Sequence, residues 1–196
     1  MIERIRELRI VLASASPRRA ELLHQIGIEP EIIPSRVEEV VTSRDPERIV
    51  RELSEQKAAE VAGRLAGGPV LVIGSDTVVS IDGQILGKPA DRQTAYGMLE
   101  RIQGKCHQVY TGVTLMLGGR KRTFSVGTRV EVYPMTAQEI EDYLDCGESM
   151  DKAGAYGIQG RFAAHIKGIE GSYTNVVGLP VGRLYQEMKQ FLEEQE

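Results

Sequence analysis

Cysteine is scarce in this chain of 196 residues, and long apolar stretches are absent. The two cysteines, Cys106 and Cys146, form no CxxC pair, which argues against a disulfide framework or a zinc site and favours reduced thiols. No run reaches the ~18 apolar residues of a membrane span, and residues 1–8 lack the apolar centre of a secretory signal. We therefore expect a cytoplasmic protein without a membrane partner.

An excess of positive charge is also lacking. Lysine and arginine number 24 against 28 aspartates and glutamates, so the formal net charge is −4. Such a chain is poorly suited to non-specific nucleic-acid binding, which needs surplus cations to displace counterions. Any phosphate that it binds must therefore be held by a local cluster of cations. The length suits one domain, or one domain folded as two lobes, and we expect a single domain over residues 1–196.

Several well-known catalytic motifs are missing. The chain contains no G-x-x-x-x-G-K-[ST] phosphate loop and no G-x-S-x-G nucleophile turn. Its three histidines, His24, His107 and His165, are scattered without zinc-ligand spacing, so we expect structural roles for them. The chemistry must come from other residues.

Apolar runs and turn signals alternate along the chain. Strands are predicted at 10–13, 30–34, 70–73, 77–81, 84–86, 107–117, 122–132, 162–166 and 173–177. Helices are predicted at 17–26, 46–66, 91–102, 136–144 and 180–194. Because helices and strands alternate and hairpins are included, the predicted class is α/β with a mixed sheet.

Basic residues open the first predicted helix. Ser16 is a candidate N-cap before Pro17, and Arg18 and Arg19 follow at once. Cations at a helix N-terminus oppose the helix dipole, unless an anion binds between them and the free N–H groups of the first turn. Together with the hydroxyl of Ser14, this turn is either a phosphate cradle or a solvated basic turn.

Lys57 lies at an unusual place in the long helix. The apolar residues Leu53 and Val61 flank it at four-residue spacing, so it falls within the apolar arc of the helix. A lysine at such a position either extends along the helix to solvent or points toward a site facing the core.

Asp76 follows a buried apolar strand, and ligands in α/β sheets tend to bind at such strand ends. The Asp82-Gly83 turn predicts a hairpin in which opposed residue numbers sum to 165, so Thr77 faces Lys88. An aspartate near a lysine is either a plain salt bridge or a base or metal ligand beside a phosphate-binding cation. We favour the second interpretation, because Lys57 and the arginine pair need a common target.

Two further groups complete the candidates. Glu38 and Glu39 are either surface residues or, with Asp76, a source of oxygen ligands for Mg²⁺. Gln159 lies in a glycine-rich stretch, and its amide complements the imide edge of uracil or thymine. The alternative for Gln159 is a bridge to the backbone of its own turn.

Seven spaced stretches together resemble the Maf family of nucleoside-triphosphate pyrophosphatases, also called septum-formation inhibitors. They are L-A-S-A-S-P-R-R at 12–19, V-E-E at 37–39, Q-K-A at 56–58, S-D-T-V-V at 75–79, G-K-P at 87–89, G-A-Y-G-I-Q-G at 154–160 and N-V-V-G-L-P at 175–180. The combination is specific, although no single stretch is. Ser75 stands where alanine is common, a departure that removes no functional group.

The resemblance implies a fold like that of inosine-triphosphate pyrophosphatases, with a mixed twisted sheet flanked by helices and two lobes around a central cleft. It also implies a homodimer that hydrolyses a nucleoside triphosphate to the monophosphate and pyrophosphate with a divalent cation, Mg²⁺ or Mn²⁺. The form of the glutamine stretch resembles the branch that acts on dTTP and UTP.

The resemblance also assigns roles to single residues. It implies that Asp76 is the proton acceptor and that Glu39 joins it at the metal. It implies roles in substrate choice for Arg18, Thr77 and Gln159, and phosphate binding for Arg19, Lys57 and Lys88. The hydroxyl of Ser14 in the first turn is a further candidate for binding substrate. The alternative function is a nucleotide-binding regulator of cell division that needs no turnover, but a mere binder has no need of an aspartate beside the cations.

Overall fold

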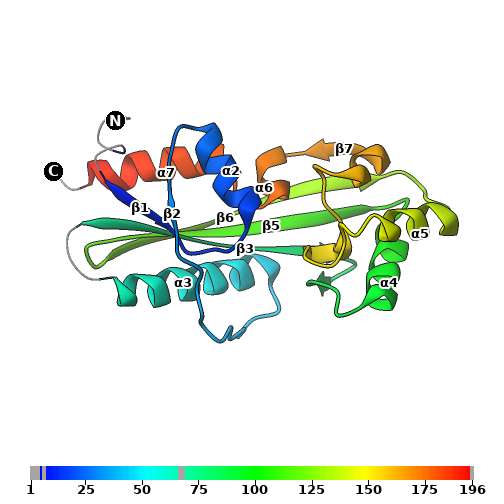
Figure 1. The fold of residues 1–196 in the computed structure, drawn as a ribbon, viewed down its shortest axis with the longest axis horizontal. Helices are drawn as coiled ribbons and strands as arrows, with labels where there is room; N and C mark the ends of the chain where they lie inside the picture. Colours follow the sequence, from blue (N-terminus) through cyan, green and yellow to red (C-terminus); the bar gives the residue numbers. More distant parts are fainter. Residues whose placement is uncertain (1–4, 6–7, 66–68, 195–196) are drawn as a thin grey trace. The chain divides into compact units, whose positions relative to one another are not determined.

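The protein has a mixed seven-stranded sheet flanked by helices, which confirms the predicted class (Figure 1). The computed structural model describes residues 5, 8–65 and 69–194. The strand order is β2-β1-β3-β5-β6-β7, and β4 pairs with β3. The strands are β1 Arg9–Leu12, β2 Glu31–Ile32, β3 Val70–Ile81, β4 Gln84–Leu86, β5 Cys106–Leu117, β6 Arg120–Val132 and β7 Ile166–Glu170. The helices are α2 Pro17–Gln25, α3 Pro46–Arg64, α4 Arg92–Ile102, α5 Ala137–Asp145, α6 Tyr173–Val177 and α7 Val181–Glu193, with short 3-10 turns at Ala153–Ala155 and Arg161–His165.

The chain divides into two compact units, and each is built from separate stretches of sequence. The first unit comprises Met1–Asp76, Thr111–Val126 and Gly178–Glu196, and the second comprises Thr77–Tyr110 and Gly127–Val177. Strands β3, β5 and β6 contribute residues to both units. The predicted single domain over the whole chain stays a prediction.

The first unit surrounds the parallel strands β2, β1 and β3. Helix α3 covers one face of its sheet, and α2 and α7 cover the other (Figure 1). Two glycines allow α3 to lie very close to the strands. A Cβ on Gly74 would meet Ser54 O at 2.2 Å, and one on Gly112 would meet Val50 O at 2.1 Å. The backbone of α3 is therefore held directly against β3 and β5.

Local signals explain where α3 begins. Asp45 caps it by accepting a hydrogen bond from the Glu47 N–H, and Pro46 occupies the first turn, as the sequence predicts. The predicted end near residue 66, with glycines at 67 and 68, lies outside the described residues. Ser16 is at the N-cap of α2, but its side chain makes no capping hydrogen bond.

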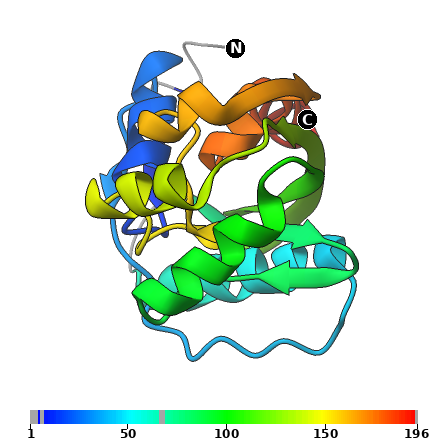
Figure 2. The ribbon, with the colours of Figure 1, turned by 90° about the vertical axis from the view of Figure 1, so that its right-hand side faces the viewer.

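In the second unit, the Asp82-Gly83 hairpin has the predicted register. Val79 pairs with Leu86 and Ile81 with Gln84, so the opposed numbers sum to 165. Helices α4 and α5 lie side by side in this unit (Figure 2). Asp91 caps α4 and a capping box at Thr136 begins α5.

Two predicted strands of the glycine-rich region are wrong. Residues 161–165 form a 3-10 turn and the strand follows as β7, while residues 173–177 form helix α6. Buried contacts override the local strand propensity of both segments. Phe162 is fully buried against Tyr143 and Tyr156, and the buried Asn175 amide donates to Val109 O and Thr128 Oγ1.

Two expectations about environment can be compared with the structure. Cys106 and Cys146 are free thiols, as expected. Within the described part of the chain, no helix combines the length and the apolar character that crossing a membrane requires.

Candidate active site

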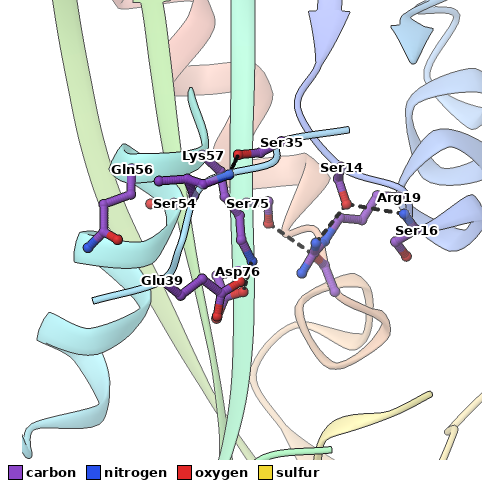
Figure 3. A network of polar contacts seen from close by, with 12 residues as sticks. Ser14, Ser16, Arg19, Ser35, Glu39, Ser54, Gln56, Lys57, Ser75 and Asp76 are labelled. Atoms are coloured by element: carbon purple, nitrogen blue, oxygen red, sulfur yellow. Dashed lines mark hydrogen bonds and ion pairs between the residues drawn. The ribbon is translucent and has the colours of Figure 1, made fainter. Parts of the chain in front are cut away.

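Lys57 lies at the centre of a charged cluster in the first unit. Its Nζ forms a short ion pair with Asp76 Oδ1 and lies 2.9 Å from Glu39 Oε1 (Figure 3). Only 16% of the Lys57 side chain and 14% of the Asp76 side chain are exposed, against 49% for Glu39. Of the two orientations open to Lys57, the structure has the inward one. Helix α3, strand β3 and the loop before α3 each supply one of these three residues.

Asp76 itself lies within a strand. The sequence placed it just beyond the end of a strand that stops at residue 73, but β3 continues unbroken to Ile81. The position is still special, because the parallel pairing with β1 ends at Leu12 and Ile73. Asp76 lies three residues beyond the last β3 residue that pairs with β1.

A second group gathers at the start of α2. Arg19 donates from Nη1 to Ser14 Oγ at 2.9 Å and from Nε to Gly178 O at 2.8 Å. The Ser14 hydroxyl also accepts from the Ser16 N–H at 3.2 Å (Figure 3). Since Ser14 Oγ accepts from both groups, its own proton is available to a ligand. The Ser75 hydroxyl, on the strand next to Asp76, donates to the same Gly178 carbonyl at 3.2 Å.

The electrostatics link the two groups. Burial lowers the pKa of the Arg19 guanidinium, and the Asp76 carboxylate opposes that shift. The half-buried Arg18 adds a second positive charge that lowers the pKa of Arg19, while Glu39 raises it. Lys57 and Arg19 therefore both interact with Asp76 and Glu39, and Arg18 adds positive charge beside Arg19. An anionic ligand at this place would relieve the repulsion between the neighbouring arginines.

The carboxylates suit a divalent cation. Lys57 already places one positive charge between Glu39 and Asp76, so both carboxylates can face a common cation. Mg²⁺ at phosphate sites is commonly held by one or two carboxylates, with water and substrate phosphates supplying the other oxygens. Among the described residues, no three histidines, cysteines, aspartates or glutamates gather at one point. A cation held by Glu39 and Asp76 would take its remaining ligands from water or from substrate phosphates. Glu38 and Glu39 are both exposed residues of this loop, and Glu39 is the one that forms an ion pair with Lys57.

The other three predicted site residues, Thr77, Lys88 and Gln159, belong to the second unit. Thr77 is half-buried on β3, and Lys88 is exposed. The β3–β4 ladder ends at Leu86, so the opposition of Thr77 and Lys88 remains an extrapolation of its register. Gln159 is exposed, and within the described residues no hydrogen bond engages its side-chain amide. The alternative in which Gln159 bridges its own turn is therefore not seen.

Aromatic residues hold the backbone that carries Gln159. The Gly157 N–H donates to the Tyr143 hydroxyl at 3.1 Å, and Phe162 packs between Tyr143 and Tyr156. The Tyr156 hydroxyl lies 2.7 Å from Nε2 of the buried His107. Burial lowers the pKa of His107 to about 4, so its imidazole is neutral near pH 7. As expected, this histidine has structural contacts.

Sequence reasoning gave no role to two polar groups of the cluster. The Gly178 carbonyl accepts from both Arg19 and Ser75, and a backbone acceptor leaves no signal in a sequence. Gln56, beside Lys57, makes two hydrogen bonds to the backbone of Val40. Its signals in the sequence are its place in the Q-K-A stretch and the four-residue spacing that it shares with other polar residues of α3.

Comparison with known proteins supplies the family. The model of the Maf family, described as "Maf-like protein", matches residues 9–191, and the chain therefore belongs to the Maf family. A protein named dTTP/UTP pyrophosphatase from Agathobacter rectalis is 52% identical over 196 aligned residues, covering 92% of this chain and 96% of that protein. Proteins of the same name from Carboxydothermus hydrogenoformans and Bacillus velezensis are 50% and 48% identical. They cover 94% and 93% of this chain, and 99% and 96% of their own lengths.

Proposed function

We propose that this protein is a nucleoside-triphosphate pyrophosphatase that hydrolyses dTTP and UTP to the monophosphate and pyrophosphate. The observation that carries the proposal is the Asp76 carboxylate beside Lys57 and within the field of Arg19. An aspartate and phosphate-binding cations are what water attack on a phosphoanhydride requires. The shared name of relatives that are about half identical along almost the whole chain supports the substrate assignment.

In the proposed reaction, a water oxygen bonds to the α-phosphorus while the bond from that phosphorus to the bridging oxygen breaks. Asp76 takes a proton from the water, and the electron pair leaves with the pyrophosphate. Arg19 and Lys57 offset the negative charge that develops on the leaving group. Arg18 and the Ser14 hydroxyl bind further phosphate oxygens at the start of α2.

Glu39 and Asp76 are the residues that would hold a divalent cation, Mg²⁺ or Mn²⁺. Such a cation, when bound, polarises phosphate oxygens and lowers the pKa of coordinated water. The contacts of Lys57 with both carboxylates then hold them in orientation. Family membership supports a metal-assisted hydrolase, and the choice between the two cations belongs to the test below.

The proposal assigns substrate contacts to three residues of the second unit: Thr77, Lys88 and Gln159. Lys88 adds a cation for the triphosphate, and Thr77 and Gln159 select the nucleotide. The exposed amide of Gln159 can donate to a carbonyl and accept from the imide N–H of uracil or thymine. The family resemblance further suggests a homodimer, which light scattering after size-exclusion chromatography would test. It also suggests a cytoplasmic enzyme, and the free thiols of Cys106 and Cys146 suit that compartment.

The second candidate is a regulator of cell division that binds nucleotide without turnover. It is less favoured, because binding alone gives Asp76 no task beside the cations. The deciding measurement is pyrophosphate release from a panel of nucleoside triphosphates with Mg²⁺ or Mn²⁺. The proposal expects release from dTTP and UTP. Tight binding of both nucleotides without pyrophosphate release would support the regulator instead.

A further inference from the structure

Four polar residues of α3 hold the backbone of the loop that carries Glu39. They lie at four-residue intervals and therefore form one stripe along the helix. We call this set the α3 ladder: Glu52, Gln56, Glu60 and Arg64. Its partners lie in residues 34–42, and as the helix number rises the loop number falls. The loop is thus fastened antiparallel to the helix.

The two ends of the α3 ladder hold the ends of the loop. Glu52 accepts from the Thr42 N–H at 3.0 Å and from the Thr42 hydroxyl at 2.6 Å. At the other end, Arg64 donates to Pro34 O at 2.8 Å. Hydrogen bonds from Thr42 lower the pKa of Glu52, so its carboxylate stays charged and able to accept.

The middle of the α3 ladder holds the residues next to Glu39. Glu60 accepts from the Arg36 N–H at 3.0 Å. Gln56 binds both backbone groups of Val40: its Oε1 accepts from the N–H at 2.9 Å and its Nε2 donates to the C=O at 2.7 Å. The side-chain amide of Gln56 supplies both a donor and an acceptor, whereas a glutamate carboxylate here would accept from the N–H but repel the C=O.

The apolar side chains that follow Glu39 in this loop bury little surface. Val40 and Val41 are 57% and 49% exposed, so burial of their side chains contributes little to its order. A segment with few buried contacts opens easily unless hydrogen bonds restrain it. The hydrogen bonds of the α3 ladder, together with the Lys57–Glu39 ion pair, therefore restrain the loop around Glu39.

Gln56 and Lys57 are neighbours on α3 and contact two adjacent loop residues, Val40 and Glu39. Gln56 holds the backbone that follows Glu39, and Lys57 contacts the Glu39 carboxylate at 2.9 Å (Figure 3). Mg²⁺ demands near-ideal placement of its oxygen ligands. Groups that orient a metal ligand are commonly important for metal affinity although they never touch the metal.

We propose that Gln56 is a positioning residue that fixes the Glu39 carboxylate for a divalent cation by clamping the backbone of Val40. The inference rests on the proposed function for its site, but it concerns the loop rather than the substrate. Gln56 contacts neither the nucleotide nor the cation. Its effect must therefore appear in metal affinity and loop order before it appears in turnover.

The test compares Gln56→Leu with Glu55→Leu. The control residue precedes Gln56 on the same helix, is equally half-buried, and pairs with Lys121 instead of the loop. Amide hydrogen exchange of residues 36–42 reports loop order, and electron paramagnetic resonance of Mn²⁺ alone reports metal affinity. For Gln56→Leu we expect faster exchange at Val40 and roughly tenfold weaker Mn²⁺ binding. Glu55→Leu should match the unmodified protein in both measurements.

Turnover of dTTP over a Mg²⁺ titration adds a kinetic measurement. Gln56→Leu should need more Mg²⁺ for half-maximal rate and recover most of its kcat at saturation. Glu52→Leu, one turn from Gln56 on the α3 ladder, should give a smaller change. Equal Mn²⁺ affinity in Gln56→Leu and Glu55→Leu would overturn the inference, as would the absence of Mn²⁺ binding by the unmodified protein. Mn²⁺ binding and exchange as expected, without pyrophosphate release from any nucleotide, would overturn the proposed function alone.

Discussion

The ammonium of Lys57 on α3 contacts the carboxylate of Asp76 on β3, and both side chains are largely buried. An isolated buried charge is strongly disfavoured, so removing either partner would leave the other in an unfavourable environment. This pairing holds the Asp76 carboxylate beside a cation, as a base at a phosphate site requires.

Asp76→Asn should abolish most of the hydrolysis while the fold persists. The change preserves shape but removes the negative charge and the proton acceptor. Turnover of dTTP should fall by a factor on the order of 10²–10⁴. Circular dichroism and steady-state pyrophosphate release check the two parts. Asp82→Asn in the exposed hairpin turn is the matched control, and wild-type turnover in Asp76→Asn would disprove the assignment.

The cations should matter for rate as well as for binding. Arg19→Ala, Lys57→Ala and Lys88→Ala each remove a charge that offsets the developing pyrophosphate, so kcat should fall together with kcat/KM. For Arg19 and Lys57 we expect losses on the order of 10²-fold in kcat/KM. Lys121→Ala, an exposed lysine paired with Glu55, should leave both constants unchanged. A rise in KM with unchanged kcat would mean that these cations only strengthen substrate binding.

Base selection should depend on Gln159. Cytosine carries an amino group where uracil has a carbonyl, and its N3 accepts where the N3 of uracil donates. An amide held in one orientation mismatches both groups, so kcat/KM for UTP should exceed that for CTP by a factor on the order of 10² or more. Gln159→Ala should narrow the ratio, and Gln84→Ala, exposed on β4, should preserve it. Equal constants for UTP and CTP in the unmodified protein would refute this role.

Stability should fall in mild acid because of His107. Its pKa is lowered by burial from 6.5 to about 4, so between these values the unfolded chain binds a proton that the folded protein does not. The contribution is complete above pH 6.5 and is lost as the pH falls toward 4. Between pH 6.5 and 5 the free energy of unfolding should decrease by about 2 kcal/mol from this group. Urea unfolding of His107→Gln over the same range should lack that part of the decrease, and an unchanged pH dependence in the variant would contradict the assignment.

Alanine substitutions at two glycines, Gly74 on β3 and Gly63 within α3, should change the free energy of unfolding in opposite directions. Gly74→Ala places a Cβ against the backbone of Ser54, so α3 must shift away from β3. We expect a loss of stability of roughly 1–3 kcal/mol and lower turnover, because Lys57 moves relative to Asp76. A Cβ added to Gly63, on the same helix, would meet no atom within 4 Å outside its own helical backbone. Gly63→Ala should raise the free energy of unfolding by about 0.5–1 kcal/mol, as urea titrations would show. Unchanged stability and turnover in Gly74→Ala would mean that α3 can move away from β3 without cost.

Much of the first unit could be predicted because its signals are local. The cap at Asp45 and the apolar arc around Lys57 are visible in a single stretch of sequence, and the structure confirms both. Helix α6 could not be predicted in this way. Its β-branched residues favour a strand, but the buried Asn175 amide bonds to strands far away in the sequence.

The residues around the charged cluster likewise differ in whether the sequence alone could reveal them. Lys57 and Asp76 are unusual in their own segments, which made them visible as candidates. Gln56 is an ordinary residue on the polar side of a helix, and its partner is the backbone of a loop without periodicity. Contacts between a side chain and distant backbone depend on the folded path of the chain, so composition and spacing do not reveal them.

The α3 ladder requires its four residues to keep their rotational positions around the helix axis. One residue inserted or deleted between Glu52 and Arg64 would turn everything beyond it by about 100° and carry the later members away from residues 34–42. Substitution of one member removes one attachment and spares the others. Changes in the length of this helix should thus be far more damaging than changes in its composition, even at positions that face solvent and touch no ligand.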